Sequence, residues 1–276
     1  MVITSEIARA VGLTEPVAIV WSDTKPEDAL VIKPGIWACV MWFYAKVVSE
    51  GKTAAFSRET CGCPGGAMGL GFGRPFEKHA AGSEENFCLF LSYGREGAAD
   101  KEKFDAFVEA IHDRRQKQMF VNGERFKKDP STVQDFLSCL PLFDIPARYI
   151  IFKPLNKVAA GEQIKSVIFL ANADQISALS ILANYHRGQV TDGVVVAAGA
   201  SGCQAIGICT YKEEIATNQR AIIGLTDLSA RNAVRKTLGS DKLTFSVPYL
   251  LFLEMERNVS NSFLEQDLWK GIRDGA

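Results

Sequence analysis

The chain has 276 residues, of which 47% are hydrophobic and 23% are charged, and its formal net charge is -1. This composition is typical of a folded globular protein and argues against long disordered stretches, while the balanced charge provides no global field that favours nucleic acid or an anionic membrane. Residues 1–10 lack a secretory signal, and the longest apolar run, 36–45, is about half of what spans a bilayer, so we expect a cytoplasmic protein without a membrane segment.

The N-terminal part predicts a short helix, a strand and an amphipathic helix. Residues 7–16 read as a helix and a proline-marked turn, and the β-rich residues 17–21 follow as a strand. The amphipathic helix spans about residues 35–50, because Gly51 stands just past its last periodic position and glycine readily adopts the left-handed backbone of a C-cap.

A second group of elements follows a cysteine loop at residues 60–70. Residues 86–93 read as a strand, and residues 100–119 read as one amphipathic helix with phenylalanines on its apolar face. Residues 122–131 are polar and charged. We therefore interpret them as the connection between two halves of the chain.

The second half repeats this order of elements. Residues 136–146 predict a helix and a proline-marked turn, and residues 149–152 predict the strand that follows. An amphipathic helix is predicted at residues 173–186 with Gly188 as its stop, and a second cysteine loop follows at residues 200–208.

The C-terminal part predicts two more strands and a helix. The strands are expected at residues 220–226 and 243–247, and the helix at residues 260–272. The side chains of this helix that we expect to face inward are Phe263, Leu264 and Leu268. Since strands and helices intermix in both halves, the sequence predicts an α/β or α+β fold.

The two cysteine loops match each other. Gly62-Cys63 aligns with Gly202-Cys203, and Ala67-Met-Gly-Leu70 aligns with Ala205-Ile-Gly-Ile208 after a gap of two residues. Because helix, strand and loop recur in the same order, we infer two diverged half-repeats packed as one compact pseudo-twofold sandwich. The predicted half-repeats are residues 1–125 and 132–276.

Seven cysteines without a disulfide spacing pattern indicate metal or redox chemistry. Within residues 61–66, Cys-Gly-Cys-Pro-Gly-Gly, both sulfur atoms can converge, and the glycines let backbone N–H groups approach a sulfide, thiolate or phosphate. The second loop adds a thiol, so the sequence predicts a shared iron–sulfur or other metal-thiolate site. The candidate metal ligands are Cys61, Cys63 and Cys203, with Cys39 or Cys209 as a fourth, and the candidate cofactor-binding glycines are Gly62, Gly65 and Gly66.

Other interpretations stay open. Arg231, after a predicted strand, suits a small anionic ligand, or it pairs with Asp227 or Glu254. Cys63 or Cys203 could act as an enzyme nucleophile on a small anionic metabolite. The chain could instead be a non-catalytic small-ligand sensor or an assembly subunit, and the sequence leaves its oligomeric state open, a homo-oligomer included.

Two cysteines outside the loops carry a simpler prediction. Cys88 and Cys139 stand in apolar surroundings, Phe-Cys-Leu-Phe-Leu and Phe-Leu-Ser-Cys-Leu-Pro. Free cysteine is a common small core residue. We therefore expect both to be packing residues.

Several segments together carry a resemblance to a known family. They are residues 15–19 (Glu-Pro-Val-Ala-Ile), Ala38-Cys39, residues 63–70, Gly202-Cys203, residues 227–231 (Asp-Leu-Ser-Ala-Arg) and residues 244–248 (Thr-Phe-Ser-Val-Pro). Over nearly its whole length the chain resembles the uncharacterised family called domain of unknown function 169 (DUF169), also labelled ArCR. The resemblance implies a prokaryotic, cytoplasmic protein with no assigned reaction. Family members usually show one cysteine in the first loop, which matches Cys63, so Cys61 is an addition of this chain.

Overall fold

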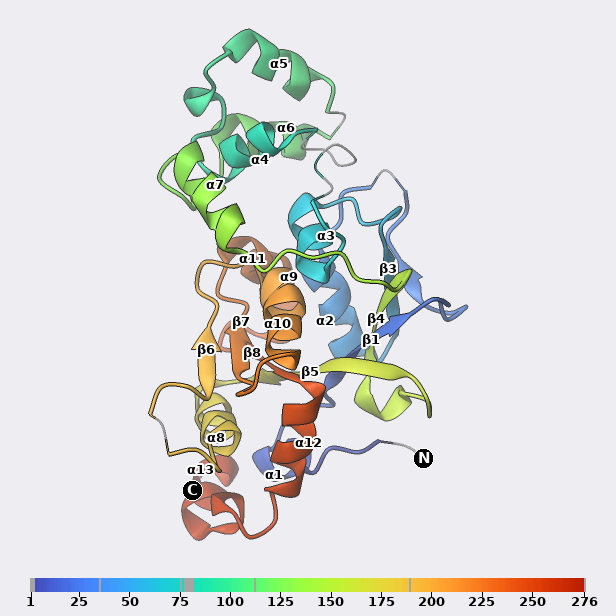
Figure 1. The fold of residues 1–276 in the computed structure, drawn as a ribbon, viewed down its shortest axis with the longest axis vertical. Coiled ribbons are helices and arrows are strands. Elements are labelled where there is room, and N and C mark those ends of the chain that lie inside the picture. Colours follow the sequence, from blue (N-terminus) through green and yellow to red (C-terminus); the bar gives the residue numbers. More distant parts are fainter. Residues whose placement is uncertain are drawn as a thin grey trace.

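The computed structural model describes residues 3–34, 36–74, 76, 82–111, 113–188 and 190–275. Within these residues the chain forms one eight-stranded mixed sheet with helices on both faces, and a group of four helices stands apart at one end (Figure 1). This arrangement confirms the mixed α/β class expected from the sequence.

The sheet has the strand order β2-β3-β4-β1-β5-β8-β7-β6. The two outermost pairs, β2 with β3 and β6 with β7, are parallel, and every other neighbouring pair is antiparallel. The first four strands of the chain form one half of the sheet, and the last four form the other half. From the edge of the sheet to its centre, the order within each half is second, third, fourth and first strand. The strands are β1 (Val17–Ser22), β2 (Leu30–Val31), β3 (Ala54–Ser57), β4 (Tyr149–Pro154), β5 (Gln163–Ala171), β6 (Val194–Val196), β7 (Ala221–Gly224) and β8 (Leu243–Pro248).

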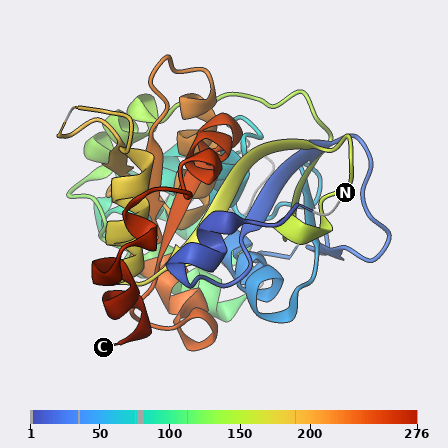
Figure 2. The same ribbon diagram turned by 90° about the horizontal axis from the view of Figure 1, so that it is seen from below.

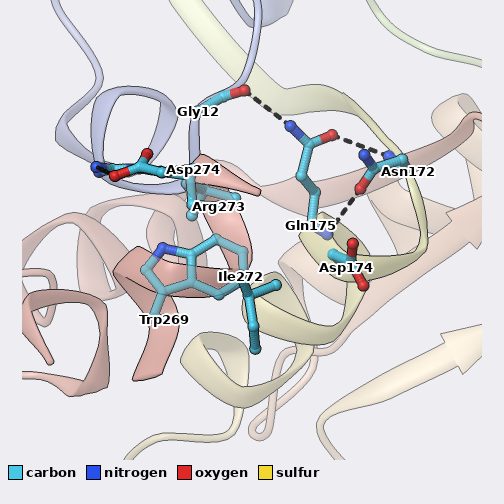
Figure 3. Close-up of a pocket in the computed structure, with 9 residues that line it drawn as sticks. Gly12, Asn172, Asp174, Gln175, Trp269, Ile272, Arg273 and Asp274 are labelled. Carbon is cyan, nitrogen blue, oxygen red and sulfur yellow. Dashed lines mark hydrogen bonds and ion pairs between the residues drawn. The ribbon is translucent and has the colours of Figure 1, made fainter. Parts of the chain in front are cut away.

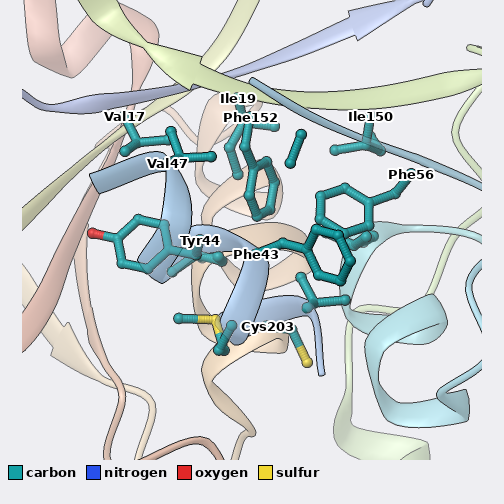
Figure 4. Packing of buried hydrophobic residues seen from close by; sticks show 14 of the residues in the cluster. Val17, Ile19, Phe43, Tyr44, Val47, Phe56, Ile150, Phe152 and Cys203 are labelled. Carbon is teal, nitrogen blue, oxygen red and sulfur yellow. The ribbon is translucent and has the colours of Figure 1, made fainter. Parts of the chain in front are cut away.

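One face of the sheet carries the helices that hold the cysteine loops. These are α2 (Val40–Glu50), α3 (Pro64–Leu70), α9 (Gly202–Gln204), the π-helical turn η4 (Ala205–Cys209), α10 (Thr210–Glu214) and α11 (Leu228–Leu238). The core beneath them contains aromatic rings in contact, with the Phe56 ring edge-on to Phe43 and tilted against Phe152 at centroid distances of 5.6 and 4.9 Å. Figure 4 shows these rings together with Cys203, which belongs to the same buried cluster. The cysteine loops therefore rest on a packed apolar base.

The opposite face of the sheet is covered by the chain termini and two further helices (Figure 2). The elements are α1 (Glu6–Val11), α8 (Ala173–Ala183), α12 (Tyr249–Arg257), η5 (Phe263–Glu265) and α13 (Asp267–Asp274), and a short turn, η3 (Leu155–Lys157), follows β4. The Glu256 carboxylate accepts hydrogen bonds from the Ser5 hydroxyl and from the Glu6 backbone N–H. This contact fixes the start of α1 against α12.

The four helices at the end of the molecule form a core of their own. They are α4 (Glu84–Leu91), α5 (Lys101–Glu109), α6 (Arg114–Asn122) and α7 (Pro130–Cys139), with η2 (Gly94–Gly97) after α4. Their buried side chains include several phenylalanines, and the Phe90 and Phe120 ring centroids lie 4.9 Å apart. Figure 1 shows this group beyond α3 and α11, on the side of the sheet that carries the cysteine loops.

The prediction of a strand at residues 86–93 is wrong, because this segment forms α4. Its short apolar run fits a strand, but Ser83 caps the segment as a helix by accepting a hydrogen bond from the Asn86 N–H. Phe87 and Phe90 then lie three residues apart on one buried helix face.

The predicted helix at residues 100–119 is two helices. The break falls between α5 and α6, where the Asp113 side chain caps α6 by accepting a hydrogen bond from the Gln116 N–H. The polar residues 123–129 connect α6 with α7.

The predicted helix ends are partly confirmed. Gly51 ends α2 with φ of 64° as expected, whereas α2 begins at Val40 and Gly35 lies outside the described residues. The helix predicted at residues 173–186 already ends at Ala183, capped by Asn184 rather than by Gly188.

The C-terminal prediction holds for Leu264, which is buried, but fails for Leu268, which is 80% exposed. The α-helix α13 begins at Asp267, later than predicted, and the residue of this helix that faces inward is therefore Trp269 instead of Leu268. The Trp269 Nε1 donates a hydrogen bond to the Ala10 carbonyl. Strands were correctly predicted at β1, β4, β7 and β8.

Candidate functional site

Four cysteines from separate parts of the sequence lie together above the sheet. They are Cys39, Cys61, Cys63 and Cys203. They lie close enough that the charge of one ionised thiol would raise the pKa of a neighbouring thiol. Their common centre is the glycine turn at the start of α3. The Cys203 Sγ contacts the Gly65 carbonyl at 3.5 Å, and a Cβ atom added to Gly66 would lie 3.7 Å from the Cys61 Sγ. The two cysteine loops predicted from the sequence therefore meet.

Cys63 is the N-cap residue of α3. Its Sγ accepts a hydrogen bond from the Gly66 N–H at 3.4 Å, and Pro64 occupies the first helical position, where its fixed φ suits a helix start. A Cβ atom on Gly66 would approach the Val40 Cγ2 to 2.9 Å. Glycine is therefore required here for α3 to start against α2.

Cys61 lies deeper than Cys63, with only 1% of its surface exposed. Its backbone N–H donates to the Ser57 carbonyl at 3.0 Å, which ties the loop to the end of β3. Between the two cysteines, a Cβ atom on Gly62 would overlap the Ile36 carbonyl oxygen. Gly62 thus lets the loop pass directly beside the backbone that leads into α2.

Cys203 stands in the first turn of α9, and its neighbours fix that turn. Ser201 and Gln204 form a reciprocal capping box, and the Ser201 Oγ lies 3.1 Å from the Cys203 Sγ. The Gly202 N–H donates to the Asp227 Oδ2 at 2.5 Å. The start of α9 is thereby bound to the start of α11.

The loops are held together by direct backbone contact. A Cβ atom on Gly69 would lie 2.7 Å from the Gln204 nitrogen and 2.8 Å from the Cys203 carbonyl carbon, and one on Gly207 would overlap the Gly69 carbonyl. Gly69 and Gly207 are the glycines that aligned in the sequence comparison of the two loops. Each allows α3 and the α9–η4 segment to touch without an intervening side chain.

Cys39 completes the group as the N-cap residue of α2. It is half-buried, and the backbone N–H groups of Met41 and Trp42 favour its ionised form. The negative charges of the Asp227 and Glu124 carboxylates disfavour the ionised form and raise the pKa of Cys39. Glu124 reaches this region from the helical end of the molecule, where its Oε1 accepts a hydrogen bond from the Ser229 hydroxyl at 2.6 Å.

Burial is the largest influence on the ionisation of these thiols. It raises the pKa of Cys61 to about 12, and it raises the pKa values of Cys39, Cys63 and Cys203 above their ordinary value. At neutral pH the four side chains are therefore neutral thiols and not nucleophilic thiolates.

The four sulfur atoms are neighbours without sharing an ion-sized position. Among the residues that the structure describes, no three or more His, Cys, Asp or Glu side chains are placed to hold a metal ion. The predicted metal-thiolate centre is therefore not preformed as a single-ion site.

Comparison with known proteins assigns the chain to a family. It matches the family described as uncharacterised ArCR, DUF169, over residues 6–258. The chain belongs to this family. The match confirms the resemblance found in the sequence, and the description brings no reaction with it. No curated protein and no solved structure matches this ArCR protein.

Two predicted site residues of the ArCR protein lie in other surroundings. Cys209 ends η4, where the charges that act on its thiol are those of Lys212 and Glu213. Arg231 donates to the backbone carbonyls of Leu225, Ser240 and Lys242. Since Leu225 has a left-handed backbone with φ of 61°, this guanidinium braces the irregular end of β7.

The two cysteines outside the loops, Cys88 and Cys139, differ in burial. Cys88 is buried in the core of the four-helix group, which confirms the packing prediction. Cys139 is exposed at the end of α7, so that prediction is wrong for it. The helix ends at this residue, and its side chain is therefore not covered by a further turn.

Sequence reasoning missed the polar residues around the thiols. Ser201, Asp227 and Glu124 all approach the cysteines, and burial raises the pKa of both carboxyls. A signal for two of them was present. Ser201-Gly-Cys-Gln204 has the form of a capping box, and Asp227 followed by apolar periodicity has the form of an N-cap.

A surface hollow lies on the far face of the sheet, between α1, α8 and α13 (Figure 3). Two of its polar side chains already have partners, since the Gln175 Nε2 donates to the Gly12 carbonyl and Arg273 pairs with Asp274. Nothing in it points to a ligand. The described helices also include none long and apolar enough to cross a membrane.

Proposed function

We propose that this ArCR-family protein binds an iron–sulfur cluster through the thiols that gather at the starts of α2, α3 and α9. The observation that carries the proposal is the meeting of the two cysteine loops, in which the Cys203 sulfur lies on the Gly65 carbonyl beside Cys63. These residues are far apart in sequence, so their contact is a property of the fold.

The local electrostatics favour a thiophilic cationic group. Cys39 and Cys63 are N-cap residues, and backbone N–H groups favour the ionised form of both thiols. At Cys203 the hydrogen bond with the Ser201 hydroxyl has the same effect. Burial opposes ionisation of the same thiols. A bound metal supplies the positive charge that offsets burial, and its binding releases the thiol protons.

The chemistry of thiol ligands defines the kind of group proposed. Cysteine thiolates hold single zinc ions and iron–sulfur clusters. An iron–sulfur cluster spans several atoms and is held by thiolates that are farther apart. Three half-buried or buried thiols around one turn suit that larger group, with Cys61 directly behind them.

The proposed role is redox or cofactor maturation work in a reducing cytoplasm. Thiols in that compartment stay reduced and available as ligands. The raised pKa values of these cysteines argue against the alternative of a cysteine nucleophile, since reactivity follows the thiolate fraction.

Anaerobic preparation tests the proposal. We expect protein supplied with iron and sulfide to contain both in similar amounts and to absorb broadly in the visible range. Cys63→Ser and Cys203→Ser should each lose most of the iron, whereas the exposed Cys139→Ser serves as the matched control and should keep it. Colourless wild-type protein without iron would overturn the proposal.

A further inference from the structure

Three buried hydroxyl side chains lie at neighbouring positions on the face of the sheet that carries the cysteine loops. They are Ser166 in β5 and Thr244 and Ser246 in β8, each with 0% of its surface exposed. Residues directly opposite each other in antiparallel strands point to the same face of a sheet. The residues opposite these three in β1 and β5 are Ile19, Leu170 and Ile168, which all belong to the buried cluster beneath the cysteine-loop helices.

Two helical elements cover these hydroxyls. The π-helical turn η4 packs on β7 and β8, and α10 packs on β5 and β8. At Thr244 the cover is close, because Gly224, its neighbour in β7, has no side chain. A Cβ atom added to Gly224 would lie 2.5 Å from the Ala205 Cβ and 2.9 Å from the Thr244 Oγ1. Ala205, the first residue of η4, is therefore seated on the sheet beside the Thr244 hydroxyl.

None of the three hydroxyl oxygens has a hydrogen-bond partner within the described part of the chain. Buried polar groups in folded proteins nearly always have a partner, which is either a protein group or an ordered water molecule. A buried hydroxyl that is left unpaired destabilises the folded state. Three such oxygens on one patch of the sheet therefore indicate a shared hydrogen-bonding ligand.

The spacing of the hydroxyls suits water as that ligand. Thr244 and Ser246 are alternate residues of one strand, which places their Cα atoms about 6.8 Å apart. Ser166 lies opposite Pro248 and is therefore a diagonal neighbour of Ser246, at roughly 7–8 Å. One water molecule joins two hydroxyl oxygens that are up to about 5.6 Å apart, since each hydrogen bond spans about 2.8 Å. Side chains that lean toward each other meet this condition, and Ser246 stands between the other two.

We infer that Ser166, Thr244 and Ser246 bind internal water beneath η4 and α10, with Ser246 shared between its two neighbours. The backbone above them is irregular, because η4 contains the non-helical residue Gly207 with φ of -99° and ψ of -106°. Helix irregularities of this kind occur at π-bulges and where water enters the hydrogen-bond ladder. The second cysteine loop, which runs directly into η4, then rests on the sheet partly through solvent. This water site does not depend on the proposed iron–sulfur function.

A crystal structure of the whole chain, at a resolution that shows ordered water, tests the inference directly. We expect a water molecule within hydrogen-bonding distance of the Ser246 Oγ and of at least one of the other two hydroxyl oxygens. A structure without such a water molecule would overturn the inference.

Thr244→Val tests the same point in solution through the sign of its effect. Valine has the shape of threonine and a higher preference for strands, so it should raise the urea midpoint if the Thr244 hydroxyl is unpaired. If this hydroxyl binds water, Thr244→Val should lower the midpoint. An unchanged or raised midpoint would contradict the inference.

A double variant tests whether the water is shared. Thr244→Val and Ser246→Ala together should lower the urea midpoint by less than the sum of their separate shifts, because either substitution alone releases the shared water. Ser57→Ala is the matched control, since it removes a buried hydroxyl of distant β3 that contacts the Thr60 hydroxyl. Its shift should add to that of Thr244→Val. Additive shifts for Thr244→Val and Ser246→Ala would refute the shared water.

Discussion

Replacement of Gly69 by alanine tests the contact on which the site depends. The added Cβ would lie 2.7 Å from the Gln204 nitrogen and 2.8 Å from the Cys203 carbonyl carbon. Carbon atoms pack at roughly 3.5–4.0 Å, so α3 and α9 would have to separate by close to an ångström. Both obstructing atoms belong to backbone, which cannot rotate away as a side chain can.

The expected loss follows from overpacking, which typically costs about 1–3 kcal/mol in free energy of unfolding. Gly271→Ala in α13 is the matched control, because a Cβ at Gly271 meets nothing within 4 Å. Alanine in place of glycine inside a helix stabilises by roughly 0.5–1 kcal/mol. The two substitutions should therefore shift the urea unfolding curve in opposite directions.

Urea denaturation followed by circular dichroism measures both variants under identical conditions. If Gly69→Ala were as stable as Gly271→Ala, α3 and α9 would not be in backbone contact. The meeting of Cys63 with Cys203 would then be wrong, and the site built on it would fail.

Two further predictions concern buried charges. Glu162→Ala should lower the free energy of unfolding by about 3 kcal/mol, because it leaves the buried Lys153 ammonium without the carboxylate that it contacts at 2.7 Å. Lys153→Met should lower it less, because no buried charge is left unpaired. Equal losses in urea denaturation would contradict this reasoning. Glu124→Gln tests a pH effect. Burial raises the pKa of the Glu124 carboxyl, and the hydrogen bond from Ser229 partly offsets this rise. The contribution of this carboxyl to the free energy of unfolding is therefore full in acid and is lost as the pH rises through the raised pKa. We expect the wild type to lose stability relative to Glu124→Gln as the pH rises from about 4 to neutral, and a gap that widens toward acid pH would refute the assignment.

The parts of the fold set by local chemistry could be predicted from the sequence. Gly51 ends α2 because only a left-handed residue fits there, and β8 follows from its β-branched and aromatic alternation. The segment 86–93 could not be assigned by periodicity, since a short apolar run fits both a buried strand and a helix. Its helical state depends on the Ser83 cap and on aromatic partners from other helices.

The site could be predicted in part, for a similar reason. The matching glycines of the two loops correctly predicted that Cys63 and Cys203 lie close together, because the absence of a Cβ atom at these glycines permits backbone contact between the loops. They could not separate Cys39 from Cys209, since Cys209 directly follows the second loop in sequence, whereas the position of Cys39 beside the first loop depends on the packing of α2 against α3. Asp227 was missed because its place beside the thiols follows from the strand order, which no local pattern encodes.

The central position of β1 has a consequence for biosynthesis. Its two sheet partners, β4 and β5, are translated long after it, and the α9 and α11 starts that surround the thiols emerge later still. Contacts so distant in sequence form slowly. A ribosome-bound chain would thus leave Cys39, Cys61 and Cys63 unburied while the half of the chain that encloses them is still unsynthesised.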